Sequence, residues 1–93
     1  MLKEFKRQYK VPDNNNILTI EASSLGYEFI LYTENLEIRD RGCLRSEKDI
    51  EEKDILKEIF GFLNINENKI NELEPYNAKI DTCKRENLVE KYI

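Results

Sequence analysis

The chain has 93 residues, of which 40% are hydrophobic and 37% charged, so it is expected to form one small domain with little stability to spare. It contains no histidine, which excludes histidine acid–base catalysis, Ser-His-Asp triads and histidine metal sites. Residues 1–16 carry four basic and two acidic side chains (net +2), whereas residues 17–93 carry 11 basic and 17 acidic side chains (net −6). An acidic body argues against free-standing nucleic-acid binding.

Residues 1–16 are interpreted as an arm that ends at the turn sequence VPDNNN. Leu2, Phe5 and Tyr9 follow a spacing of i, i+3 and i+7, which favours a short amphipathic helix. Pro12 and the Asp-Asn-Asn-Asn that follows it favour a turn. The arm is therefore either a frayed terminus or a docking segment that places Leu2, Phe5 and Tyr9 against a partner.

Three strands are predicted next, joined by short turns into an antiparallel meander. The apolar run ILTI, residues 17–20, is typical of a central strand with both faces covered. After the turn residues SSLG, the bulky sequence GYEFILY predicts a second strand. A third strand at residues 36–44 is expected to alternate, with Leu36, Ile38 and Leu44 on one face and Glu37, Arg39, Arg41 and Cys43 on the other.

A helix is predicted after this strand, with Ser46 as its cap and Asp49 completing a weak capping-box pattern. Its apolar stripe consists of Ile55, Leu56, Ile59, Phe60 and Leu63. Pro75 then ends a short helical turn, NAKID at residues 77–81 predicts a fourth strand, and TCKRENLVEKYI predicts a final helix.

The predicted class is α/β: a three-stranded antiparallel meander, a crossover helix, a fourth strand parallel to the first, and a C-terminal helix in one domain over residues 17–93. The crossover through the helix is expected to return the fourth strand parallel to the first, on a right-handed path. Glu21 and Asp81 close the first and fourth predicted strands. Parallel pairing would place both acids at the rim where open α/β sheets bind ligands.

This order, with the segments ILTIEASSLGYEFILY, RGCLRS and EPYNAKID, resembles the first half of the RNase H-like fold in its RuvC-type Holliday-junction resolvase branch. The resemblance covers residues 17–81. It implies that Glu21 and Asp81 occupy the positions of two catalytic acids that hold Mg²⁺ for phosphodiester hydrolysis. The alternative for Glu21 is an ordinary solvated residue at a strand end.

The chain departs from that family at the acids themselves. Glu21 stands where the family has Asp and Asp81 where it has Glu, and one extra methylene displaces a carboxylate by roughly an ångström, enough to spoil a positioned metal. The family's fifth strand and last helix have no counterpart in the 12 residues after Asp81, where Glu86 and Glu90 are expected on a solvated helix face. The resemblance therefore implies a degenerate domain.

Three functions follow from this interpretation. The first is a non-catalytic RuvC-like domain that binds a macromolecular partner, with a protein favoured, through an exposed sheet edge that a homodimer would also cover. The second is an Mg²⁺-dependent structure-specific nuclease completed by another chain. The third is a small acidic phage-type inhibitor of a nucleic-acid enzyme. No cofactor is expected unless the Glu21–Asp81 pair is functional, in which case Mg²⁺ is.

Arginines recur at even spacing on the third predicted strand, at Arg39, Arg41 and Arg45. Basic side chains beside aromatic ones can contact phosphate and stack bases, so these three are candidate nucleic-acid contacts. The alternative is cross-strand ion pairing with Glu28 or Glu34.

Cys43 and Cys83 lie 40 positions apart without metal-ligand spacing. This favours two reduced, buried thiols in a cytosolic protein over a disulfide. The start, MLKEFKRQYK, lacks the apolar middle of a secretory signal, and no apolar run approaches the roughly 20 residues that span a bilayer. A cytoplasmic location without membrane contact is expected.

Overall fold

The computed structural model describes residues 2–76. In chain order the elements are β1 (Lys6–Lys10), β2 (Ile17–Ala22), β3 (Gly26–Tyr32), β4 (Ile38–Arg45), α1 (Glu52–Leu63), the 3₁₀ helix η1 (Glu67–Glu72) and β5 (Glu74–Pro75). The fourth strand predicted at residues 77–81 and the predicted final helix lie outside the described residues, as do Asp81, Cys83, Glu86 and Glu90.

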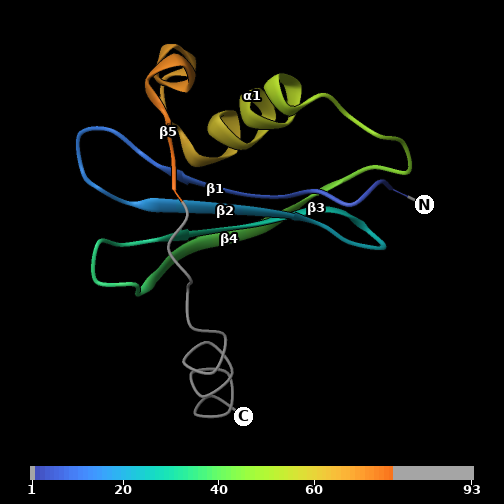
Figure 1. Cartoon of the computed structure of the whole chain (residues 1–93), viewed down its shortest axis with the longest axis horizontal. Helices are drawn as coiled ribbons and strands as arrows, with labels where there is room; N and C mark the ends of the chain where they lie inside the picture. Colours follow the sequence, from blue (N-terminus) through green and yellow to red (C-terminus); the bar gives the residue numbers. More distant parts are fainter. Residues whose placement is uncertain (1, 77–93) are drawn as a thin grey trace, which may run out of the picture.

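The strands form one sheet in the order β4-β3-β2-β1-β5, and every neighbouring pair is antiparallel. α1 and η1 lie on one side of the sheet, which we call the helix face (Figure 1). No helix or strand of residues 2–76 lies on the other side, the open face. The α/β class is confirmed. The three predicted strands pair antiparallel as β2, β3 and β4, but they continue a longer series that begins with β1.

The prediction of a parallel strand beside residues 17–22 is wrong. β1 takes this position and runs antiparallel to β2, with Tyr9 opposite Leu18. β5 pairs with the other side of β1 and is also antiparallel. An amino-terminal strand that the sequence did not predict therefore lies beside β2, in the position expected for the parallel strand at residues 77–81.

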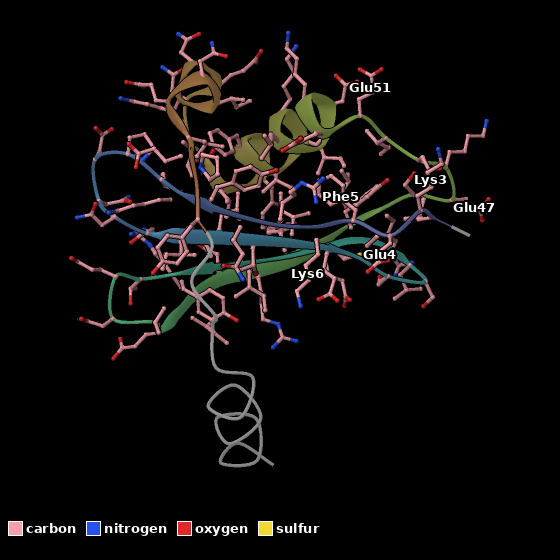
Figure 2. All side chains as sticks on the ribbon, in the orientation of Figure 1. Lys3, Glu4, Phe5, Lys6, Glu47 and Glu51 are labelled. Atoms are coloured by element: carbon pink, nitrogen blue, oxygen red, sulfur yellow. The ribbon has the colours of Figure 1, made fainter. Side chains whose placement is uncertain are left out.

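The helix expected around residues 2–9 is wrong as well, because the segment adopts the period of a strand. Phe5, Tyr9 and Val11 are separated by even numbers of residues, so they share one face of a strand. Tyr9 and Val11 are buried in the core, and Phe5 packs against it. Figure 2 shows Phe5 on the side of α1 and Lys6 on the opposite side.

The core lies between α1 and the helix face, and the predicted apolar stripe of α1 is confirmed. Ile55, Leu56, Ile59 and Phe60 are buried, and Leu63 packs against the same cluster. They meet side chains from the three central strands: Tyr9, Leu18, Ile20, Tyr27, Phe29 and Leu31. Burial of side chains of this size contributes roughly 1.5–3 kcal/mol each relative to exposure, so this layer dominates the stability of the sheet.

The helix begins later than its predicted cap. α1 starts at Glu52, with Glu51 as its N-cap. The Ser46 hydroxyl instead accepts the N–H of Lys48 at 3.2 Å in a turn. The prediction of a capping box from Ser46 to Asp49 is therefore wrong, since both side chains serve the loop before the helix.

Three hydrogen bonds hold this loop and the start of α1 to the rest of the chain. The N–H of Lys3 donates to Oδ1 of Asp49 at 2.8 Å, and the N–H of Ile50 donates to the Tyr27 hydroxyl at 3.0 Å. The Tyr9 hydroxyl donates to the Glu52 carboxylate. Each bond links a strand or the amino-terminal segment to residues 49–52, which fixes where α1 enters the core.

Candidate functional site

β4 forms one edge of the sheet, with β3 as its neighbour. Six of its eight residues are exposed, and Gly42 and Leu44 are half-buried. An exposed edge strand of this length offers a row of backbone donors and acceptors to which another extended chain can pair. β4 is therefore the candidate functional site.

The alternation of backbone hydrogen bonds shows which groups of β4 face outward. The N–H of Ser46 donates to the carbonyl of Leu25 on the β3 side at 3.2 Å. Because alternate residues of an antiparallel strand turn their N–H and C=O groups to the same side, Leu44 and Gly42 also face β3. The outward groups are therefore the N–H and C=O of the intervening residues, Arg41, Cys43 and Arg45.

A bulge interrupts β4 near its beginning. Leu31 lies opposite Asp40, whereas Tyr32 lies opposite Ile38, so Arg39 is the extra residue. The extra residue reverses the alternation, which puts Ile38 on the open face while Leu44 packs against the core. The prediction that Ile38 and Leu44 share a face is wrong for this reason. Leu36, predicted with them, lies in the preceding turn with a left-handed φ of 65°.

The predicted nucleic-acid contacts Arg39, Arg41 and Arg45 are all exposed on β4. Arg41 and Arg45 share the open face, but Arg39 occupies the bulge, so the even spacing does not produce one continuous stripe. Within residues 2–76, the ion pairs are Lys57–Glu67, Lys69–Asp13 and Lys69–Glu72. The alternative pairing of the arginines with Glu28 or Glu34 is thus not found, and none of the three arginines forms an ion pair with another described residue.

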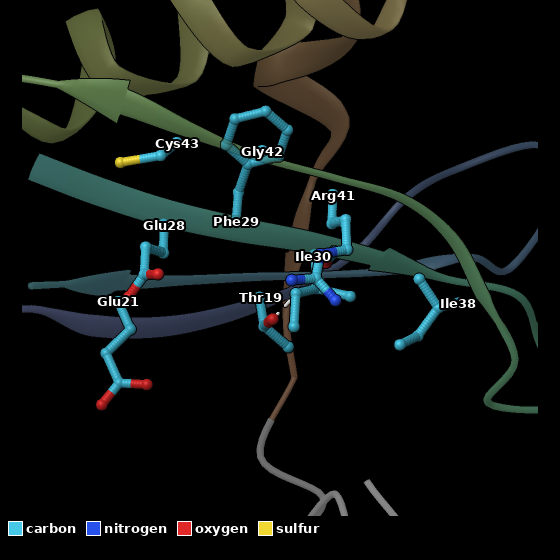
Figure 3. Close-up of a pocket in the computed structure, with 9 residues that line it drawn as sticks. All are labelled: Thr19, Glu21, Glu28, Phe29, Ile30, Ile38, Arg41, Gly42 and Cys43. Carbon is cyan, nitrogen blue, oxygen red and sulfur yellow. Dashed lines mark hydrogen bonds between the residues drawn. The ribbon is translucent and has the colours of Figure 1, made fainter. Parts of the chain in front are cut away.

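An aromatic rim borders the same edge on the helix face. Gly42 has no side chain, and the ring of Phe29 covers it so closely that a Cβ there would lie 2.7 Å from Cζ of Phe29 (Figure 3). The Phe29 ring meets Phe62 of α1 edge to face, with centroids 5.4 Å apart. Phe62 is 64% exposed, so the described residues leave a large apolar ring uncovered beside the edge strand.

A pocket of about 350 Å³ lies on the open face between β2, β3 and β4 (Figure 3). Its apolar floor comes from Ile30 and Ile38, and Arg41 stands at its wall. Glu21 of β2 and Glu28 of β3 lie on the open face and line the same pocket. The pocket is therefore continuous with the β4 edge and carries charges of both signs.

The predicted metal ligand Glu21 lies exposed at the end of β2, opposite Lys6 on one side and Glu28 on the other. Its predicted partner Asp81 lies outside the described residues. Within residues 2–76, no three cysteine, aspartate, glutamate or histidine side chains come together as a metal-binding group. Mg²⁺ prefers a near-octahedral set of oxygens, and Glu21 with Glu28 alone does not assemble one, so the Mg²⁺ site stays a prediction.

The predicted docking residues Leu2, Phe5 and Tyr9 pack within the chain itself. Tyr9 is 6% exposed, and Leu2 and Phe5 lie against the same core. Phe5 meets Tyr27 edge to face with centroids 5.8 Å apart, and the Arg7 guanidinium lies 5.0 Å from the centre of the Phe5 ring. These contacts give the three residues a structural role, and their role toward a partner stays a prediction.

The Tyr9 hydroxyl is held in its protonated form. Burial raises the pKa of Tyr9 above the ordinary value of 10.0, and the hydrogen bond to Glu52 raises that pKa further. The hydroxyl can therefore donate to Glu52 up to alkaline pH.

The expectation of two buried, reduced thiols can be compared with the structure at Cys43. Cys43 is free, as expected, but it is exposed on β4 rather than buried. The reason is its place on the open face of an edge strand. Cys83 lies outside the described residues.

Two features of the site escaped sequence reasoning. The bulge at Arg39 leaves no pattern in a single sequence, because its effect appears only when β3 is aligned beside β4. Phe62 did leave a signal: it is the one large apolar residue of α1 outside the buried stripe. A residue off the apolar stripe of an amphipathic helix is expected to be exposed.

Comparison of the chain with protein-family models, with curated proteins and with solved structures gives no match. Neither helix in residues 2–76 has the length and apolar character needed to cross a membrane. The resemblance to the RuvC-type branch stays a prediction, and the antiparallel strand β1 beside β2 gives it no support.

Proposed function

We propose that this chain is a non-catalytic binding protein that takes up an extended segment of a protein partner along β4. The observation that carries the proposal is an eight-residue edge strand with outward backbone groups at Arg41, Cys43 and Arg45. Addition of a strand to such an edge satisfies the backbone of both chains and lets side-chain contacts provide specificity.

The surroundings of β4 support this function more than catalysis. β4 offers a row of exposed backbone groups, and within residues 2–76 no three cysteine, aspartate, glutamate or histidine side chains come together as a metal-binding group. The nuclease alternative depends on Glu21 and Asp81, and Asp81 lies outside the described residues. The phage-type inhibitor is one form of the proposed binding function, with an enzyme as the partner.

The proposal keeps the expected cytoplasmic location. Cys43 is an exposed free thiol at the centre of the outward row. A reducing compartment would keep this thiol available and the edge unblocked.

Amide exchange of the full chain in the presence of a library of short extended peptides tests the proposal. The peptides would be selected on the immobilised protein and then studied in solution by NMR. We expect the selected peptides to slow exchange at the amides of Arg41, Cys43 and Arg45, while those of Gly42 and Leu44, already turned toward β3, change little.

Cys43→Pro provides the matched control, because proline removes one outward N–H and leaves the bonds to β3 in place. Selected peptides should bind this variant at least about tenfold more weakly. Undiminished binding to Cys43→Pro, or protection confined to amides outside β4, would overturn the proposal.

A further inference from the structure

We infer that the segment received by β4 alternates acidic with apolar side chains, a conclusion that rests on the proposed function and specifies the partner. Side chains of a strand point alternately to the two faces of its sheet. A chain paired with β4 would therefore place every second side chain beside Arg41, Cys43 and Arg45 on the open face, and the others beside Gly42 and Leu44 on the helix face.

The open-face side of β4 favours acids. Arg41 and Arg45 are four residues apart, about 13 Å along the strand, and neither makes an ion pair with another of the described residues. Glu28 lies opposite Cys43, between the two arginines, and pairs with neither of them. Carboxylates four residues apart on the incoming chain would stand opposite these guanidinium groups, which is a favourable cross-strand arrangement.

The charge of β4 contrasts with that of the whole chain. Residues 38–45 contain three arginines and one aspartate, whereas the full sequence has a net charge of −4. Asp40 belongs to the helix-face series with Gly42 and Leu44, so it does not neutralise the arginines of the open face. Glu28 also lies on the open face, but it is on β3, one strand further from an added chain than Arg41 and Arg45. The two guanidinium groups therefore attract an acidic segment to this edge.

The helix-face side of β4 favours an apolar side chain. Gly42 adds no side chain of its own, and the Phe29 ring fills the space above it. Phe62 continues this aromatic surface outward and is 64% exposed. A side chain of the incoming strand beside Gly42 would cover Phe62, which removes apolar surface from water.

A second copy of the chain fits the edge less well. Antiparallel pairing of two β4 strands centred on Cys43 would set Arg41 of each copy opposite Arg45 of the other. Like charges directly opposite each other destabilise a strand pair. The arginines therefore disfavour pairing of β4 with a second copy of β4, and they favour pairing with an acidic segment of a partner.

Fluorescence anisotropy with synthetic peptides tests the inference. The probe is a peptide of about nine residues that alternates glutamate and valine, long enough to cover the outward row. One comparison peptide has the same composition in separate glutamate and valine blocks, and another alternates lysine and valine. We expect the alternating acidic peptide to bind at least about tenfold more tightly than either, with affinity that falls as salt rises.

Substitutions test the contribution of each face of the sheet to peptide binding at β4. Arg41→Glu/Arg45→Glu should weaken the acidic peptide at least about tenfold, and Phe62→Ala several-fold. Lys53→Glu/Lys57→Glu, which changes net charge equally from the exposed side of α1, should stay within about twofold. Circular dichroism confirms that each variant is folded.

The outcomes separate this inference from the proposed function. Equal binding of the block or lysine peptide overturns the alternation or the acidity, yet the proposed function stands if other peptides still protect the amides of Arg41, Cys43 and Arg45. If no peptide protects them, the proposed function fails. A wild-type dimer in sedimentation experiments that Cys43→Pro abolishes would make a second copy the occupant and overturn the inference.

Discussion

The two edges of the sheet are treated in opposite ways. At one edge, the two-residue strand β5 pairs with Tyr9 and Lys10 at the end of β1. Pro75 lies opposite Tyr9 and contributes no N–H, and the Tyr76 N–H donates to the Gln8 carbonyl at 3.0 Å. At the other edge, β4 has no covering strand among residues 2–76 and carries three arginines. A covering strand prevents any further chain from pairing with the residues it covers, whereas charged side chains disfavour some partner chains and favour others.

The largest expected effect tests the direction of the backbone groups in β4. Leu44→Pro should lower the free energy of unfolding by about 3 kcal/mol or more, because it removes a bond to β3 and a side chain from the core. Cys43→Pro should cost about 1 kcal/mol or less, since its N–H faces outward. Urea denaturation measures both, and equal losses would contradict the assignment of the outward row.

The next effect concerns the contact between Gly42 and Phe29. Gly42→Ala should lower the free energy of unfolding by about 1–3 kcal/mol, because its Cβ would lie 2.7 Å from Cζ of Phe29 and the ring would have to move. Gly61→Ala serves as control, because no atom lies within 4 Å of the added Cβ. That change should stabilise α1 by about 0.5–1 kcal/mol, and thermal unfolding compares the two.

A smaller effect belongs to the edge at β1, which Tyr9 holds to α1. Tyr9→Phe removes the hydrogen bond to Glu52 and should cost about 1 kcal/mol. The pKa of Tyr9 is raised on folding, so the unfolded chain loses this proton first and the contribution is complete below pH 10.0. Stability should therefore fall above pH 10.0 less steeply in Tyr9→Phe than in the wild type. Parallel pH profiles of denaturant midpoints would refute the linkage.

The smallest effect is expected for the arginines of the open edge. Arg41→Gln and Arg45→Gln should each change the free energy of unfolding by no more than about 0.5 kcal/mol, because neither residue has an ion pair among the described residues. A decrease in the free energy of unfolding well above this value that disappears in high salt would contradict this expectation. It would show that the two arginines stabilise the fold.

Local patterns in the sequence predict β2, β3 and α1, because their apolar periodicity is strong and lies within one segment. β1 escapes for a physical reason: Phe5 and Tyr9, four residues apart, fit the spacing of a helix as well as that of a strand, and pairing with β2 across the VPDNNN turn decides between them. The expected parallel strand failed with it, since β1 occupies the position beside β2.

The sequence predicts the charged residues of the candidate site but not how they are arranged on the sheet. The arginines of β4 stand out in the sequence, but their lack of intramolecular partners depends on register. Glu28 is aligned with Cys43, not with Arg41 or Arg45, and a single sequence does not contain that alignment. The uncovered ring of Phe62 likewise depends on which side of α1 meets the sheet.

The bulge at Arg39 sets the reach of this edge. Beyond it, the strand reverses its alternation and twists more strongly, so an added chain cannot continue in register past Asp40. At the opposite end, Ser46 turns away into the loop before α1. The part of β4 that can pair with an added chain is therefore about five residues long, roughly 17 Å, which is long enough for a short linear motif in extended form.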